Sequence, residues 1–135
     1  MSEEYEVPLD LLYSREHVWL RVEEGEAVLG ITDYAQKKLR EVVYVELPNV
    51  GHSFTENEPI ATLESVKASA EVYAPISGRI VEVNSRLIDT PELINEDPYG
   101  EGWIAKIEVD DEAGLENLLE ADEYLKYIED LEESG

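Results

Sequence analysis

Alternating apolar and polar positions run through most of the chain up to residue 109 and predict a fold built mainly from short β-strands. Every second side chain of a strand points to the same face, so alternation marks a strand with one face in a core. Turn-forming residues separate these stretches at short intervals, as in antiparallel strands joined by tight connections. The predicted strands are 17–22, 27–31, 42–47, 59–63, 72–75, 79–84 and 103–109. Four residues of the last strand are expected on one face: Trp103, Ala105, Ile107 and Val109.

Helical patterns occur at two places within this series of strands and again after it. Thr32 is a good N-cap for a short helix over 34–39, and Pro91 is well placed to start a helical turn within 85–94. From Asp111 onward the apolar residues recur with helical spacing. They form two predicted stripes, the first Leu115, Leu118 and Leu119, the second Tyr124, Leu125, Ile128 and Leu131. The whole pattern predicts a mainly β fold, a small sandwich or barrel with short helices and C-terminal helices.

One lysine stands between two of the central strands. Lys67 lies in the segment Glu64-Ser65-Val66-Lys67-Ala68, and strand-like runs on both sides predict a hairpin over 60–75 with the lysine at its tip. Small residues flank Lys67, and acidic residues precede and follow it. Loop tips held by a rigid scaffold often carry function, and a lysine there is open to modification by another protein.

A repeated pattern surrounds this lysine. Four residues recur in the same order at a constant offset: Val45, Pro48, Gly51 and Asn57 match Val72, Pro75, Gly78 and Asn84. Lys67 falls between the two copies. A repeat of this kind predicts one supersecondary unit used twice, with two halves related by a rough two-fold. Coincidence is the alternative, because Pro-x-x-Gly is a common turn signal.

Composition narrows the classes of function. The 135 residues, of which 43% are hydrophobic, suffice for one domain with a core. Thirty-three acidic residues against ten Lys and Arg give a formal charge of −23, which argues against binding to nucleic acid. The charge suits docking onto basic faces of partners, or serves only to keep the protein soluble. The chain has no cysteine, so any redox chemistry must arrive on a cofactor.

Location is also constrained by the sequence. The first six residues are acidic and lack the apolar segment of a secretion signal. No apolar run approaches the length that spans a membrane. We therefore expect a soluble cytoplasmic protein that does not bind a membrane.

Nothing in the sequence resembles a catalytic centre. His17 and His52 have no cysteine partner and no metal-ligand spacing, so structural roles are expected for both. The chain lacks a glycine-rich phosphate loop and the short motifs of metalloproteases and serine hydrolases. The other lysines are expected to be solvated surface charges: Lys37 and Lys38 on a helix, Lys106 on the polar side of a strand and Lys126 on a C-terminal helix. This absence favours a carrier or binding module over an enzyme.

Several segments, in the same order along the chain, resemble the glycine cleavage system H-protein family. The resemblance runs from about Tyr13 to the C-terminal helices. Besides the segment around Lys67 it includes Gly30-Ile31-Thr32-Asp33-Tyr34-Ala35-Gln36, Val45-Glu46-Leu47-Pro48, Val72-Tyr73-Ala74-Pro75-Ile76-Ser77-Gly78, Val81-Glu82-Val83-Asn84, Pro91-Glu92-Leu93-Ile94-Asn95 and Pro98-Tyr99-Gly100-Glu101-Gly102-Trp103. The agreement of many motifs is far more specific than any one of them.

The resemblance implies a hammerhead-type β fold, like that of biotinyl and lipoyl carriers, with lipoic acid in amide linkage to Lys67. Glu64, Ser65, Val66 and Ala68 would complete the attachment site. The implied organisation is a single lipoyl-carrier domain over 1–135, with a lead-in at 1–16, a β core at 17–109 and C-terminal helices at 111–135.

The resemblance also implies partners. In this family the lipoyl disulfide accepts an aminomethyl group from a pyridoxal-phosphate glycine decarboxylase and delivers it to a tetrahydrofolate-dependent aminomethyltransferase. A flavoprotein dihydrolipoyl dehydrogenase reoxidises the dithiol, and a lipoate ligase or a lipoyl or octanoyl transferase attaches the cofactor. The carrier catalyses none of these steps.

Two departures from the family pattern keep alternatives open. Val18 stands where the family usually has a glutamate near the loaded arm, and Arg40 stands where the family tends to have glycine. One alternative is an H-like lipoate-binding protein of another pathway, such as sulfur-compound oxidation; another is an unmodified acidic adaptor. A biotin carrier is disfavoured, because Val66 and Ala68 occupy the places where such carriers usually have methionine.

Overall fold

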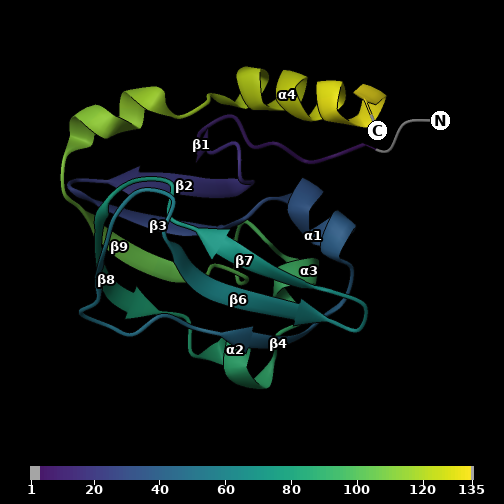
Figure 1. Ribbon diagram of the computed structural model, residues 1–135, viewed down its shortest axis with the longest axis horizontal. Helices are drawn as coiled ribbons and strands as arrows, with labels where there is room; N and C mark the ends of the chain where they lie inside the picture. The colour runs from purple at the N-terminus through teal and green to yellow at the C-terminus, as the bar shows by residue number, and fades with distance from the viewer. Residues whose placement is uncertain (1–3, 135) are drawn as a thin grey trace.

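The computed structural model describes residues 4–134, so positions 1–3 of the predicted lead-in and position 135 of the C-terminal segment lie outside the described residues. The chain forms two antiparallel sheets (Figure 1). The six-stranded sheet has the order β1 (Leu12–Tyr13), β2 (Val18–Glu23), β3 (Glu26–Ile31), β9 (Ala105–Val109), β8 (Gly78–Val83) and β5 (Ser53–Phe54). The three-stranded sheet has the order β4 (Val42–Glu46), β6 (Pro59–Ser65) and β7 (Ser69–Tyr73).

Helices lie around these sheets. They are α1 (Asp33–Leu39), α2 (Arg86–Asp89), α3 (Leu93–Glu96), the 3₁₀ helix η1 (Glu112–Asn117) and α4 (Ala121–Ser134). Thr32 caps α1 as predicted, because its side chain accepts a hydrogen bond from the Ala35 N–H at 3.2 Å. The short helices expected within 85–94 are α2 and the start of α3, and Pro91 lies in the turn between them.

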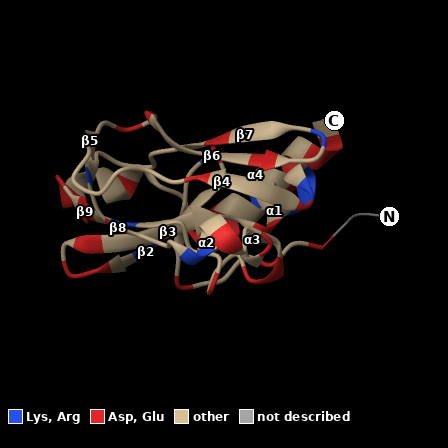
Figure 2. Ribbon diagram, turned by 90° about the horizontal axis from the view of Figure 1, so that it is seen from below, with Lys and Arg blue, Asp and Glu red and all other residues tan. Residues whose placement is uncertain are grey.

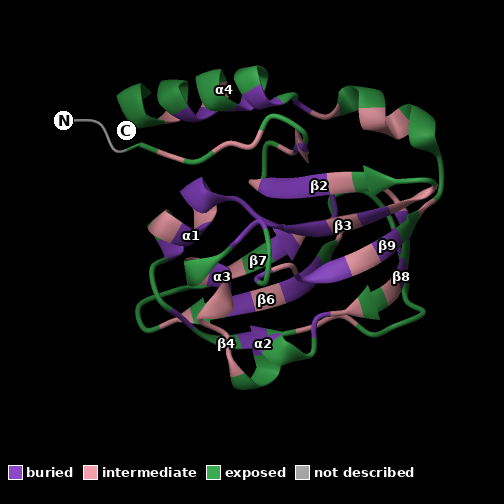
Figure 3. Ribbon diagram, turned by 180° about the vertical axis from the view of Figure 1, so that it is seen from behind, coloured by how far each residue is buried: buried purple, intermediate pink, exposed green. Residues whose placement is uncertain are grey.

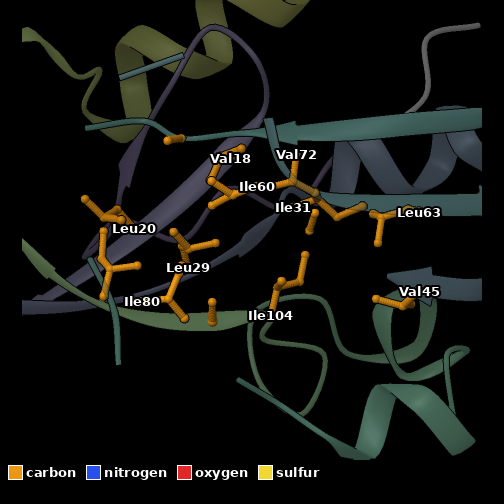
Figure 4. Packing of buried hydrophobic residues seen from close by; sticks show 14 of the residues in the cluster. Val18, Leu20, Leu29, Ile31, Val45, Ile60, Leu63, Val72, Ile80 and Ile104 are labelled. Atoms are coloured by element: carbon orange, nitrogen blue, oxygen red, sulfur yellow. The ribbon is translucent and has the colours of Figure 1, made fainter. Parts of the chain in front are cut away.

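The main core lies between the two sheets. Leu20, Leu29 and Ile80 of the large sheet share one buried cluster with Leu63 and Val72 of the small sheet (Figure 4). Two sheets packed over a common apolar layer make a sandwich, which confirms the predicted fold class. The sheets do not close into a barrel.

A second core lies on the other face of the large sheet, under α4. Tyr13 of β1 and Tyr124 of α4 stack with ring centroids 4.7 Å apart, and Ile128 is fully buried beside them. Figure 3 shows the buried side of α4 turned toward the strands. Strand β2 is therefore covered on both faces: Val18 and Leu20 pack into the main core, and Trp19 packs into the second.

Two predictions about apolar faces were wrong. Trp103 does not share a face with Ala105, Ile107 and Val109, because it lies before β9 in a turn closed by its N–H to the Gly100 carbonyl at 3.1 Å. Trp103 packs on the second core, and the next residue, Ile104, is fully buried in the main core. The chain thus passes from one core to the other within two residues.

The first C-terminal stripe is not helical throughout. Leu115 lies in η1, Leu118 is extended, and Leu119 exchanges backbone hydrogen bonds of 2.7 and 2.8 Å with Tyr13. That pairing extends the edge of the large sheet before α4 begins. In the second stripe Tyr124 and Ile128 are buried as predicted, whereas Leu125 is 38% exposed.

The repeated pattern occupies corresponding places in the fold. One copy runs through β4 and β5, and the other runs through β7 and β8. Strands β4 and β7 flank β6 on opposite sides, and β5 pairs with β8. This arrangement agrees with the predicted use of one unit twice. The two-residue strands β1 and β5 were not predicted.

Candidate functional site

Lys67 lies at the tip of the hairpin formed by β6 and β7, as predicted. Glu64 and Ser69 form the last strand pair, and the hydroxyl of Ser65 then braces the turn. The Ser65 N–H and hydroxyl donate to the Ala68 carbonyl at 2.8 and 3.2 Å, and the hydroxyl accepts from the Ala68 N–H at 3.1 Å. No residue of this turn has a positive φ, so it forms without glycine.

The amine of Lys67 is open to solvent. Lys67, Glu64, Val66 and Ala68 are all exposed, Val66 to 80%, and Ser65 is half-buried. Within residues 4–134 no hydrogen bond or ion pair engages the Lys67 side chain. The strands below the tip are anchored in the main core, since Ile60, Ala61 and Leu63 of β6 and Val72 of β7 are buried there. The Lys67 amine is therefore exposed at the end of a hairpin whose strands are anchored in the core.

A groove opens beside the tip, between β7, α1 and the segment before β2. Its volume is about 350 Å³. Nearly buried apolar side chains form its floor: Ile31, Leu39, Leu63 and Val72. Exposed carboxylates of Glu16 and Glu71 stand at its margin, together with His17, Tyr34 and Lys38.

The margin of the groove is negatively charged. Lys38 is paired with Glu132 of α4 at 2.9 Å, whereas Glu16 and Glu71 enter no ion pair in the described part of the chain. An apolar floor with carboxylates at its edge suits an apolar chain that ends in a cation.

His17 is part of the support of this groove. Its Nδ1 lies 2.8 Å from the Tyr124 hydroxyl, which in turn lies 2.7 Å from the Thr32 hydroxyl. Burial lowers the pKa of His17 to about 4, so the ring is neutral at pH 7. His52 lies elsewhere on the surface, 2.9 Å from a Glu58 carboxylate oxygen. These contacts agree with the structural roles predicted for both histidines.

The two departures from the family pattern are Val18, which is buried, and Arg40, which has an unusual backbone conformation. Val18 is 1% exposed and packs near Ile60 and Val72, so position 18 presents no polar group to the groove (Figure 4). Arg40 follows α1 with φ 72° and ψ −157°, a conformation that favours glycine.

Sequence reasoning did not place Glu16 at the groove. Glu16 precedes His17, whose φ of 69° turns the chain before β2. No local signal marks a histidine for that conformation. Glu16 could therefore be placed beside the hairpin only once the segment before β2 was seen to line one groove with α1 and β7.

Other kinds of site are absent from the described residues. Between residues 4 and 134, no three His, Asp or Glu side chains gather closely enough to hold a metal ion. None of the helices there combines the length and the apolar composition needed to cross a membrane. Acidic segments, red in Figure 2, far outnumber basic ones along the ribbon.

Comparisons with known proteins agree on one family. A family model described as "Glycine cleavage H-protein" matches residues 11–131. A glycine cleavage system H protein of Herpetosiphon aurantiacus is 54% identical over 124 residues, covering 92% of this chain and 95% of its own. A probable glycine cleavage system H protein of Aeropyrum pernix is 52% identical over 119 residues, covering 88% of this chain and 83% of its own.

A solved structure supports the same conclusion. The crystal structure of a glycine cleavage system H protein from Mycobacterium marinum superposes with a TM-score of 0.77 at 35% sequence identity. The match covers 87% of this chain and 95% of that one. Fold, hairpin and sequence agree, and the chain belongs to the glycine cleavage system H-protein family, the carrier component of that system.

Proposed function

We propose that Lys67 carries lipoic acid in amide linkage. On this proposal the chain is one carrier domain that passes the aminomethyl group of glycine between enzymes and catalyses no step itself. The observation that carries the proposal is the exposed, unpaired amine of Lys67 at the tip of a hairpin anchored in the core. Membership of the H-protein family supports it.

The residues around Lys67 fit the group. Acylation removes the lysine charge and leaves a long, mostly apolar arm. The attached dithiolane supplies the disulfide that takes up and releases the aminomethyl group. Ala68 leaves room for a modifying enzyme, and the Ser65 hydroxyl keeps the turn closed while the side chain of Lys67 is engaged. Because the chain has no cysteine, no protein thiol competes with the carried sulfurs.

The groove beside the hairpin would receive the arm of a lipoylated Lys67. Ile31, Leu63 and Val72 offer apolar surface next to the hairpin. Glu16 and Glu71 offer carboxylates to an ammonium group at the end of the arm. The loss of a glutamate at position 18 is therefore compatible with carriage of an amine, because two other carboxylates stand at the same groove.

The partners proposed are the glycine decarboxylase, the aminomethyltransferase, the dihydrolipoyl dehydrogenase and the enzyme that attaches lipoate. A tethered arm keeps its reactive group at high effective concentration for each docked enzyme. The acidic surface suits partners with basic faces, and we expect association to weaken as salt rises.

Substitution Lys67→Arg tests the attachment. The variant keeps the charge and approximate length but loses the acylatable amine, so we expect normal folding and no lipoylation. Intact mass is measured after co-expression with a lipoate ligase. The wild type and the control Lys126→Arg, which alters an exposed lysine of α4, should each gain one lipoyl group. A wild type without added mass, or a modified Lys67→Arg, would overturn the proposal.

A second assay identifies the pathway. The lipoylated chain is mixed with a glycine decarboxylase, and exchange of bicarbonate carbon into glycine is followed beside a known H protein. We expect both carriers to support exchange. Failure of this chain alone would assign it to another lipoate-dependent pathway.

A further inference from the structure

The three-stranded sheet has an outer face that no helix covers. Figure 1 shows β6 and β7 at the front of the molecule with nothing packed over them. The strand register places two rows of residues on this outer face: Tyr44, Glu64 and Ser69 in one row, and Glu46, Thr62 and Glu71 in the other. All are exposed except Thr62, which is half-buried. The row that contains Tyr44 lies next to the turn that holds Lys67.

Apolar side chains are exposed at this end of the sheet. A bulge between Val42 and Tyr44 interrupts the register of β4, and both Val43 and Tyr44 point into solvent, 49% and 53% exposed. Val66, beside Lys67, is 80% exposed. An exposed aromatic residue among small apolar ones is typical of the centre of a protein interface.

The outer face is acidic. Its carboxylates are those of Glu46, Glu64 and Glu71, and none of them pairs with a cation in residues 4–134. Unpaired negative charges on one surface repel an acidic partner and attract a basic one. The complementary surface would therefore have an apolar pocket bordered by Lys or Arg.

We propose that this outer face, with Tyr44 as its apolar anchor, is the docking surface for the enzyme that acylates Lys67. The inference rests on the proposed function. The acylating enzyme must bring an activated carbonyl carbon into bonding distance of Nζ, so its surface must reach the sheet next to the turn. Of the partners proposed, this enzyme alone must reach Nζ itself, whereas the others act on the sulfur end of the arm.

The reaction itself defines what must be brought together. The amine attacks the carbonyl carbon of a lipoyl adenylate that the ligase makes from lipoate and ATP. The amide C–N bond forms, the acyl C–O bond to AMP breaks, AMP leaves, and two protons pass from the original ammonium group to solvent. No oxidation or reduction occurs. Docking through Tyr44 serves only to place Nζ at that carbon.

The test uses the full-length unmodified chain with a purified lipoate ligase, lipoic acid and ATP. Initial rates from intact mass at varied carrier concentration give KM and kcat for the carrier. We expect Tyr44→Ala to raise KM about tenfold with little change in kcat, the usual cost of removing an interface anchor. We expect Glu46→Lys to raise KM several-fold and to weaken its dependence on salt.

Matched controls separate docking from general effects. Leu9→Ala removes an apolar side chain that is 90% exposed away from this sheet, and Glu133→Lys reverses an exposed charge on α4. Both should keep the wild-type KM, and circular dichroism should show all variants folded. If Tyr44→Ala and Glu46→Lys match the controls, or lower kcat at unchanged KM, the docking surface is wrong while the proposed function stands. If the wild type is never lipoylated on Lys67, the proposed function fails first.

Discussion

Replacing Arg40 by glycine should stabilise the protein. Arg40 ends α1 with φ 72° and ψ −157°, a region that residues with a Cβ avoid. Both contacts of this residue that the structure shows are made by its backbone: its N–H donates to the Gln36 carbonyl at 2.8 Å, and its carbonyl accepts from the Asn95 amide at 2.8 Å. The side chain is exposed. Glycine would keep both hydrogen bonds and relieve the strain.

The expected gain follows from two opposing terms. A residue held in such a conformation stores about 1–3 kcal/mol. Glycine loses more conformational freedom on folding, which costs about 0.5–1 kcal/mol. The net change is a gain of about 1 kcal/mol in the free energy of unfolding. With an unfolding entropy of about 2.1 cal/mol/K per residue, this gain raises Tm by about 3–4 °C.

Urea denaturation and thermal melts of Arg40→Gly and Arg40→Ala test this reasoning. Alanine removes the same charge as glycine but keeps a Cβ, so it should retain the strain and show no comparable gain. Equal stabilisation by both substitutions would mean that charge, rather than backbone conformation, governs the effect. No gain in Arg40→Gly would refute the assignment of strain to this position.

Two further perturbations probe the support of the site. Gly78→Ala should lower the free energy of unfolding by about 2–4 kcal/mol, because a Cβ at Gly78 would collide with the Glu108 carbonyl of the neighbouring strand. Urea denaturation measures this change, and a loss below about 0.5 kcal/mol would contradict the prediction. His17 has a pKa of about 4 in the folded state and titrates near 6.5 when the chain is unfolded. Because the unfolded chain binds this proton more readily, the free energy of unfolding should fall as pH falls from 6.5 to 4, by at most about 1.4 kcal/mol per pH unit. His17→Gln should show a shallower loss over that range, and an identical slope would refute the role of His17.

Local signals in the sequence were enough to predict most strands and the position of Lys67 at a hairpin tip. Alternation, turn residues and the Thr32 cap depend on neighbours a few positions away, so they can be read without the fold. The hairpin around Lys67 follows from the same rules, since two apolar strands joined by a short polar segment have few other arrangements. The repeat at a constant offset likewise predicted one unit used twice, and β4 and β7, one from each copy, lie on opposite sides of β6.

Only the tertiary structure decided which face of each element is covered. Trp103 and Ile104 are neighbours that enter different cores, and Leu119 leaves its predicted helix to pair with Tyr13, 106 positions earlier. The groove likewise joins Glu16, α1 and Glu71 from three separate parts of the chain. Burial and strand pairing depend on what packs from elsewhere, and contacts between distant residues leave no periodic trace in a single sequence. The sequence therefore determined most strands and the place of Lys67 at a hairpin tip, whereas packing decided the groove, its carboxylates and the open face of the small sheet.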